Sequence, residues 1–536
     1  MQVCFYSPFG HEGCVGDVEV DLRRGIPMVD IVGLADGSVR QAREGVRSAI
    51  RSSGFEFPSG RVLVSLSPAD FMKEGNGFSL PVALAVLQES EKQKTGRNFP
   101  DDKVLVLGGL LPDGRVERVH GIFAALQDAK EKGIKHAIVP VGFDEKFPEG
   151  IDVRVVSDLG EAWGALTSVS REAGRGPQEE EVKKDVEPGI RFPSLSREET
   201  TLDGLKGGAY PLLKRAMALA VAGGHNMLAV GSPGCGKSLA MKCMPEIMPL
   251  LSSEEQASVS RLYSLAGLFG SMSVHDGERP FRMPHQSANL EGMFGGGKKL
   301  LPGEVSLAHH GVLFLDEASE FKTSVLRMLR VPSYSGAITL SRYGRSTVFP
   351  ANFRLAMAAS PCPCGNSGSH DRTCLCSASS VSRYWDKLGG PLLDFVEVRA
   401  DVNAYLSPDN KRKLSDISVA DMRGMIGRAW KAQHERQGKM NGKLTRSELD
   451  AQLSPDVRKW FEGEEARTEL PPSSGVAVLR LARTIADMTG ERDVSIDRIK
   501  EAFDYHADVS RQLEKKRGAE KEREPVSRGD DDGWGY

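Results

Sequence analysis

One stretch, Gly231-Ser-Pro-Gly-Cys-Gly-Lys237-Ser238, constrains the fold more than any other part of the sequence. It follows the apolar run 227–230 and leads into Leu239-Ala-Met-Lys, which is typical of a helix. A glycine-rich loop ending in Lys-Ser between a strand and a helix is the setting of a phosphate-binding P-loop. Its backbone N–H groups and the positive end of the helix dipole face phosphate oxygens. We therefore predict an ATP site formed by Gly231, Ser232, Pro233, Gly234, Cys235, Gly236, Lys237, Ser238 and Leu239.

A second motif, Gly311-Val-Leu-Phe-Leu-Asp316-Glu317, places two carboxylates at the end of an apolar strand downstream of that loop. In ATP-hydrolysing sites a P-loop lysine contacts the β- and γ-phosphates, and a serine and an aspartate hold Mg²⁺. We expect Lys237 to take the first role, and Ser238 with Asp316 the second. We expect Glu317 to polarise the attacking water as a general base. Lys237 and Glu317 are the predicted catalytic residues.

Length and composition limit the remaining classes. A chain of 536 residues is too long for one core and predicts about three domains. The net charge of −3 gives no overall basic character, so any nucleic-acid contact must come from local patches. No apolar run reaches the length of a membrane span, and the first residues lack a signal pattern. We expect a cytoplasmic protein with no membrane association, whose cysteines are reduced or bound to metal.

Hydrophobic periodicity predicts an α/β protein with a helical C-terminal part. Alternating runs predict strands, and apolar residues at helical spacing predict helices in each half. We expect an α/β domain over residues 1–168, a charged linker over 169–199, a parallel-sheet core over 200–403, a helical domain over 404–511 and a disordered tail over 512–536. The expected strands are 18–22, 62–66, 104–107, 136–140, 227–230 and 311–315, and the expected helices are 37–50, 80–87, 121–130, 212–222, 421–434, 475–488 and 494–503.

Four of the eight cysteines gather in one short segment, as two Cys-x-Cys pairs separated by nine residues. Two close pairs of thiolates across a loop can supply the four ligands of a tetrahedral zinc site. One residue between the cysteines of a pair is fewer than zinc sites usually have. The sequence leaves two interpretations open, a structural zinc or four reduced thiols in a tight turn. The four candidate ligands are Cys362, Cys364, Cys374 and Cys376, with His370 as an alternative.

Several longer strings resemble the YifB/ComM family of Mg-chelatase-like AAA+ ATPases, from about residue 6 to about residue 510. The strings are Ile31-Val-Gly-Leu-Ala-Asp-Gly-Ser-Val39, Ser67-Pro-Ala-Asp-Phe-Met-Lys-Glu-Gly75, Arg279-Pro-Phe-Arg-Met-Pro-His285, Pro302-Gly-Glu-Val-Ser-Leu-Ala-His309 and Cys362-Pro-Cys-Gly365. The resemblance implies an AAA+ P-loop core with a C-terminal helical lid, assembled as a homo-oligomeric ring, with a hexamer as the expected size. The N-terminal domain of the family resembles the proteolytic domain of Lon proteases.

In that comparison Ser79 falls at the position of the Lon nucleophile. A Ser–Lys dyad needs a lysine to take the hydroxyl proton. Phe123 stands where the lysine is expected, so we predict a structural or interaction domain without protease activity.

The resemblance also implies a helical insert near 286–297 and a β-hairpin near 338–349, both projecting into the pore of the ring. Arginines near a hairpin tip suit contact with a phosphate backbone. We therefore take Arg342, Arg345, Lys298 and Lys299 as candidate DNA contacts, and DNA as the expected partner.

Three positions depart from the family pattern. The sensor-1 position, usually asparagine, is Ser360; the arginine finger of Pro-Leu-Leu-Asp-Arg is replaced by Phe395; and Ser473 stands where sensor 2 is expected, with Arg480 as a candidate substitute. Arg383 and Lys387 are the nearest cations that could act on a neighbouring subunit. Since an arginine finger contributes about 10³–10⁵ in rate, we predict nucleotide binding with weakened hydrolysis.

Three functions remain. The resemblance favours a DNA branch-migration motor for recombination and natural transformation. The alternative is a nucleotide-gated scaffold with little turnover. A magnesium-chelatase motor that inserts Mg²⁺ into a tetrapyrrole is disfavoured, because the N-terminal domain and the Cys-Pro-Cys-Gly string are those of YifB/ComM.

Overall fold

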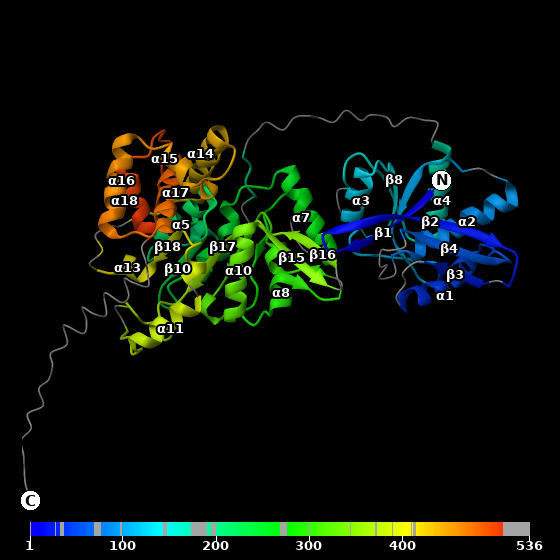
Figure 1. The fold of residues 1–536 in the computed structure, drawn as a ribbon, viewed down its shortest axis with the longest axis horizontal. Coiled ribbons are helices and arrows are strands. Elements are labelled where there is room, and N and C mark those ends of the chain that lie inside the picture. The colour runs from blue at the N-terminus through cyan, green and yellow to red at the C-terminus, as the bar shows by residue number, and fades with distance from the viewer. Residues whose placement is uncertain are drawn as a thin grey trace, which may run out of the picture.

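The computed structural model describes residues 2–26, 28–32, 37–68, 77–96, 99–142, 147–172, 190–194, 200–268, 276–298, 300–342, 345–369, 372–388, 390–408, 410 and 414–506. Figure 1 shows three parts in a row: an N-terminal sheet domain, a central sheet core and a C-terminal group of helices. The predicted mixed α/β fold, with a parallel-sheet core and a helical C-terminal region, is confirmed.

The N-terminal domain is built on a seven-stranded sheet in the order β3-β4-β2-β1-β5-β8-β9. The pairs of β2 with β1 and with β4 are antiparallel, and the remaining pairs are parallel. Its strands are β1 (Gln2–Phe9), β2 (Glu12–Arg23), β3 (Met28–Val32), β4 (Arg61–Ser67), β5 (Lys103–Val106), β8 (His136–Pro140) and β9 (Asp152–Val156), with a short pair β6 (Gly109–Leu110) and β7 (Val116–Glu117) beside it. Parallel neighbours need crossover connections, and helices supply two of them: α1 (Gly37–Ser52) lies between β3 and β4, and α3 (Ile122–Glu131) lies between β5 and β8.

Apolar residues of this sheet pack against helices, and along β1 they do so on both faces, because Val3 and Phe5 belong to one apolar cluster and Cys4 and Tyr6 to another. Val62, Val64 and Leu66 alternate along β4 and are buried, as the period-2 pattern predicts. The helices are α1 (Gly37–Ser52), α2 (Ser79–Thr95), α3 (Ile122–Glu131) and α4 (Leu159–Glu172). Helix α4 continues four residues past the predicted domain boundary at residue 168.

The central core is a five-stranded parallel sheet in the order β11-β14-β17-β10-β18. Both faces are covered: Met227 and Ala229 of β10 belong to one apolar cluster, and Leu228 and Val230 belong to the other. A parallel sheet buried on both faces gives continuous apolar strands, as found here. The strands are β10 (Met227–Val230), β11 (Phe281–Arg282), β14 (Val312–Leu315), β17 (Arg354–Ala359) and β18 (Val398–Asp401).

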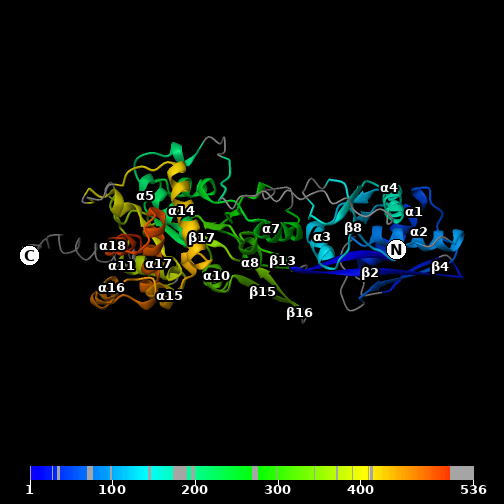
Figure 2. The same ribbon diagram turned by 90° about the horizontal axis from the view of Figure 1, so that it is seen from above.

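Short helices and small strand pairs surround this sheet. The helices are α5 (Tyr210–Gly223), α6 (Lys237–Lys242), α7 (Ser253–Ala266), α8 (Leu290–Phe294), α9 (Glu304–Leu307), α10 (Thr323–Ser335), α11 (Ala378–Leu388), α12 (Gly390–Leu393) and α13 (Val402–Leu406). The pairs are β12 (Gly295–Gly296) with β13 (Leu301–Pro302), and the hairpin β15 (Ala337–Arg342) with β16 (Arg345–Pro350). Figure 2 shows the hairpin projecting from the core. Of the expected helical insert, the structure has the single turn α8.

The C-terminal helices share one apolar core with α5 and one face of the central sheet. They are α14 (Val419–Gln437), α15 (Arg446–Asp450), α16 (Pro455–Thr468), α17 (Pro472–Thr489) and α18 (Ile496–Tyr505). Part of the predicted linker also packs here, since Arg423 donates to the Pro193 carbonyl and its guanidinium lies over Phe192. The predicted tail, residues 512–536, lies outside the described residues. Among the helices described, none combines the length and apolarity that crossing a bilayer requires.

The N-terminal domain contacts the central core through helix α7, which the sequence analysis did not predict. Arg261 of α7 pairs with Asp128 of α3 at 2.6 Å and donates to the carbonyl of His11 at 3.0 Å. The backbone N–H of His11 donates to Thr347 Oγ1 of β16 at 3.0 Å. The turn between β1 and β2 therefore rests on the β15–β16 hairpin (Figure 1).

Candidate functional site

The predicted P-loop lies between β10 and α6, as the strand–loop–helix pattern requires. Gly234 and Gly236 adopt φ values of +82° and +88°, which side chains disfavour. A Cβ on Gly236 would also lie 2.6 Å from the Tyr210 hydroxyl oxygen. Glycine is therefore needed at position 236 both for the backbone conformation and for space.

Lys237 begins helix α6 and is 8% exposed. Its Nζ donates to the carbonyls of Gly231 at 2.6 Å and Ser232 at 3.0 Å. The ammonium group thus lies inside the loop and is bonded to neutral acceptors of the loop itself. A phosphate group entering the loop would offer this ammonium charged acceptors, which form stronger hydrogen bonds.

The two predicted Mg²⁺ ligands meet although they lie 78 residues apart in the sequence. Ser238 Oγ donates to Asp316 Oδ1 at 2.6 Å. A hydroxyl and a carboxylate at one point are hard oxygen donors of the kind that Mg²⁺ binds, so these residues fit that ion. Glu317 follows with an exposed side chain and a φ of +49°, an unfavourable conformation for a non-glycine residue. Such strain is often found at functional positions.

Ser360 lies at the carboxyl end of β17, which pairs with both β10 and β14. This is the position expected for a residue that senses nucleotide. Its backbone carbonyl accepts a hydrogen bond from the Tyr384 hydroxyl at 2.9 Å, and the residue is half-buried. The side chain is close to the next loop, since a Cβ on Gly365 would lie 3.8 Å from Ser360 Oγ.

Asn403, in helix α13 after β18, holds the first residues of the P-loop, and the sequence analysis missed it. Its Oδ1 accepts from the Ser232 N–H at 3.0 Å, and its Nδ2 donates to Ser232 Oγ at 3.1 Å. The same Nδ2 donates to the carbonyl of Ser367 at 2.9 Å. An asparagine at a helix start carries no distinctive signal, because its partner Ser232 is 171 residues away.

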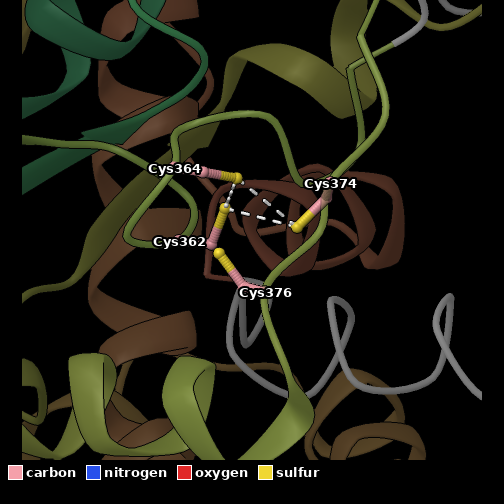
Figure 3. Close-up of side chains that lie close together, drawn as sticks. All are labelled: Cys362, Cys364, Cys374 and Cys376. Atoms are coloured by element: carbon pink, nitrogen blue, oxygen red, sulfur yellow. Dashed lines mark hydrogen bonds between the residues drawn. The ribbon is translucent and has the colours of Figure 1, made fainter.

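The four clustered cysteines converge on one point (Figure 3). Their sulfur atoms all lie within 4.8 Å of one another. The Sγ–Sγ distances are 3.4 Å for Cys362–Cys364, 3.6 Å for Cys362–Cys374 and 3.7 Å for Cys364–Cys374. Four sulfurs at about 2.3 Å from a tetrahedral zinc are about 3.8 Å apart, so the arrangement fits one such ion. His370 lies outside the described residues.

The local environment splits the acidities of these thiols. Burial raises the pKa of Cys362 to about 12. For Cys364 burial acts in the same direction, but hydrogen bonds from the Asn366 backbone and from neighbouring thiols lower its pKa to about 6. The Ser367 N–H also donates to Cys362 Sγ at 3.3 Å, a contact that favours a thiolate there.

The candidate DNA contacts lie around the hairpin. Arg342 and Arg345 are directly opposite each other in the β15–β16 register, next to the hairpin tip. Lys298 is exposed. Lys299 and the side chain of Arg345 lie outside the described residues. The backbone thus places two of the four candidates side by side, as the hairpin prediction required.

The positions that depart from the family pattern have other contacts. The Phe395 ring lies edge-on to Tyr334, with 6.5 Å between ring centroids. Ser473 is exposed in the first turn of α17. Arg480 donates to Glu397 Oε1 at 2.8 Å and to the Leu444 carbonyl at 2.7 Å. Glu397 also contacts His225, and its interactions with His225 and Arg480 keep the pKa of its buried carboxyl below the usual value, against the effect of burial. The guanidinium of the half-buried Arg480 is therefore held by groups of the chain itself.

Ser79 has a structural contact in the N-terminal domain. It is 2% exposed, and its Oγ accepts from the Leu110 N–H at 2.8 Å. Phe123, at the position expected for a catalytic lysine, is buried in a separate apolar cluster.

A parallel sheet with a glycine loop after one strand and Asp-Glu after another is the P-loop fold of AAA+ Mg-chelatase-like proteins. Comparison with known families agrees: the family described as magnesium chelatase, subunit ChlI, matches residues 207–409, with further ChlI matches over 18–142 and, for its C-terminal part, 416–506. YifB of Escherichia coli K12 is 33% identical over 91% of this chain and 94% of its own. Competence protein ComM of Haemophilus influenzae is 32% identical over 92% of this chain and 94% of its own. A Mycobacterium tuberculosis protein is 32% identical over 92% of this chain and 96% of its own. The chain belongs to the YifB/ComM family of Mg-chelatase-like proteins.

Proposed function

We propose that this chain is an AAA+ ATPase that forms a homo-oligomeric ring, with six subunits as the expected number, and acts on DNA during recombination. The observation that carries the proposal is the contact between Ser238 and Asp316 at the foot of the P-loop. The motifs come from separate parts of the chain and meet where a Mg²⁺-bound triphosphate needs them.

Each residue has a definite task in this proposal. The N–H groups of the loop and Lys237 bind the phosphates, and Ser238 with Asp316 hold Mg²⁺. When bound, that ion neutralises negative charge on the β- and γ-phosphates. Glu317 orients the attacking water and accepts its proton. Ser360, at the end of the strand between β10 and β14, hydrogen-bonds the water or the γ-phosphate.

DNA is the polymer along which we propose that the ring moves. Arg342 and Arg345 at the hairpin tip would contact phosphates, which fixes position on the duplex without reading its sequence. The relative from Haemophilus influenzae is called a competence protein, and this supports a role for the present chain in the uptake or integration of DNA.

A nucleotide-gated scaffold is the second candidate, and Phe395 and Arg480 favour it. A phenyl ring cannot neutralise charge on a transferring phosphate, and Arg480 is held by Glu397. Arg383 is exposed on α11 and donates to the Ser379 carbonyl of its own helix. On this interpretation nucleotide binding controls whether the subunits assemble, while ATP hydrolysis stays slow.

We also propose that Cys362, Cys364, Cys374 and Cys376 hold a structural zinc ion. The support is the sulfur geometry, which suits one tetrahedral ion and leaves no open coordination position for catalysis. Metal analysis of the purified chain would give one zinc per subunit, and Cys374→Ser would abolish it. A chain purified without chelators and still free of metal would contradict this assignment.

A branch-migration assay on a synthetic four-way junction tests the functional proposal. The motor requires strand movement that depends on ATP and is lost in Lys237→Met. Lys242→Met, an exposed lysine at the end of the same helix, is the matched control and should move strands normally. Nucleotide-dependent assembly without strand movement would instead support the scaffold. Movement that is independent of ATP would contradict the motor.

A further inference from the structure

The segment that carries the cysteine cluster lies directly against the P-loop. Gly365, between the two cysteine pairs, is so close to Pro233 that a Cβ on it would lie 2.6 Å from Pro233 Cδ. Pro233 is one of the loop residues between the strand β10 and the helix α6. The two segments therefore touch without room for a methyl group.

A chain of three hydrogen bonds joins the same segments. The Ser367 N–H donates to Cys362 Sγ at 3.3 Å. Asn403 Nδ2 donates to the Ser367 carbonyl at 2.9 Å, and Asn403 Oδ1 accepts from the Ser232 N–H at 3.0 Å. Ser367 and Asn403 are only 4% and 7% exposed, so water competes little for these bonds.

We infer that metal bound by the four cysteines fixes the P-loop in its binding conformation, so that zinc and nucleotide strengthen each other's binding. This inference rests on the proposed zinc site. The contacts between the thiols are weak, whereas four metal–sulfur bonds would order the segment more firmly. Loss of that order would free Ser367 and Gly365, and with them the partners of Ser232 and Pro233.

The expected size follows from these contacts. Loss of two neutral hydrogen bonds corresponds to a roughly 5- to 150-fold loss of nucleotide affinity. Linkage requires the reverse effect to have the same size, so bound nucleotide should tighten zinc binding by the same factor.

The experiment uses the full chain and two ligands, Mg²⁺-ADP and zinc. A fluorescent ADP analogue is titrated before and after zinc is removed with a chelator that leaves millimolar Mg²⁺ in place, and circular dichroism checks that the fold is retained. In parallel, a competing chelator measures zinc affinity with and without ADP. We expect a roughly 5- to 150-fold change in both affinities. A change below about twofold in ADP affinity after complete zinc loss would overturn the inference.

Two variants test the contact while all four thiols remain. Gly365→Ala should keep zinc and bind ADP more weakly, because its methyl group presses on Pro233. Gly438→Ala is the matched control: Gly438 has a similar φ of +66°, but a Cβ on it would meet no atom within 4 Å. Equal ADP affinities for the two variants would overturn the inference.

Asn403→Ala cuts the hydrogen-bond chain in its middle. In this variant zinc removal should change ADP affinity by less than in the wild type, because only the Gly365–Pro233 contact still joins the two segments. An undiminished zinc effect would overturn the proposed route. These readouts are binding constants, so absence of strand movement would contradict the proposed motor and leave this inference standing.

Discussion

Replacing Lys237 by methionine tests which of two roles this lysine has, binding a phosphate or stabilising the fold. Its Nζ donates to two neutral carbonyls, at 2.6 Å and 3.0 Å, while the side chain is 8% exposed. Methionine keeps most of the volume of the stem and removes a buried charge. The broken hydrogen bonds and the relieved desolvation oppose each other, so we expect the free energy of unfolding to change by less than about 1 kcal/mol.

When nucleotide is bound, the same substitution should have a much larger effect on the free energy of unfolding. Hydrogen bonds between the ammonium and phosphate oxygens are charge-assisted, at about 1.5–3 kcal/mol each. Removing two of them weakens binding by at least about 3 kcal/mol, or roughly 150-fold. At a concentration about 100 times the wild-type Kd, nucleotide stabilises the wild type by about 2.7 kcal/mol and the variant by only about 0.3 kcal/mol.

Thermal unfolding with and without Mg²⁺-ADP measures both effects. For a domain of roughly 150–250 residues, each kcal/mol of stability changes the midpoint temperature of unfolding by about 2–4 °C. Lys242→Met should respond to nucleotide as the wild type does. A phosphate-binding role for Lys237 would be contradicted if Lys237→Met kept the nucleotide-dependent shift, or if it lowered stability by more than about 3 kcal/mol without nucleotide.

Three further predictions concern the domain contact and the hairpin. Arg261→Ala should destabilise the chain by about 2–3 kcal/mol in urea unfolding, because the mostly buried Asp128 loses its ion-pair partner. A coupling energy under about 0.5 kcal/mol in a double-mutant cycle with Asp128→Ala would contradict this. Burial lowers the pKa of His11 to about 4, so its contribution to stability is present above about pH 6.5 and is lost as the pH falls towards 4, by at most about 3 kcal/mol. His11→Gln should flatten that part of the stability–pH curve, and identical curves for both proteins would refute the effect. In a plot of the logarithm of the DNA-binding constant against the logarithm of the salt concentration, Arg342→Ala should reduce the slope by about 0.9 for each phosphate that the arginine neutralises. Lys439→Ala in the C-terminal helical domain should leave the slope unchanged. Equal slopes for the two variants would exclude a phosphate contact at Arg342.

Much of the fold could be predicted because its signals are local. Strands such as 62–66 and 227–230 follow from alternating or continuous apolar runs, and helices such as 421–434 follow from helical spacing. The P-loop and the Asp-Glu pair are compact motifs whose chemistry depends on neighbours in sequence. Their meeting at Ser238 and Asp316 could be anticipated, because the carboxyl ends of parallel strands share one edge of the sheet.

Helix α7 shows a signal that was present and overlooked. Ser252 and Glu255 form a capping box at its start, a pattern visible in the sequence as Ser-x-x-Glu. Its contact with the N-terminal domain was not visible, because Arg261 and Asp128 are 133 residues apart.

The sequence by itself determined the chemistry of the candidate site, because a glycine loop, a lysine and two carboxylates carry their function in their own atoms. It also placed four thiols close enough in the chain to share one ion. Only the tertiary structure decided what surrounds that chemistry: Asn403 under Ser232, Gly365 against Pro233, and the β1–β2 turn on the hairpin. Those contacts join segments that are distant in sequence, so they depend on how the sheets and helices pack and leave no periodic pattern in the chain.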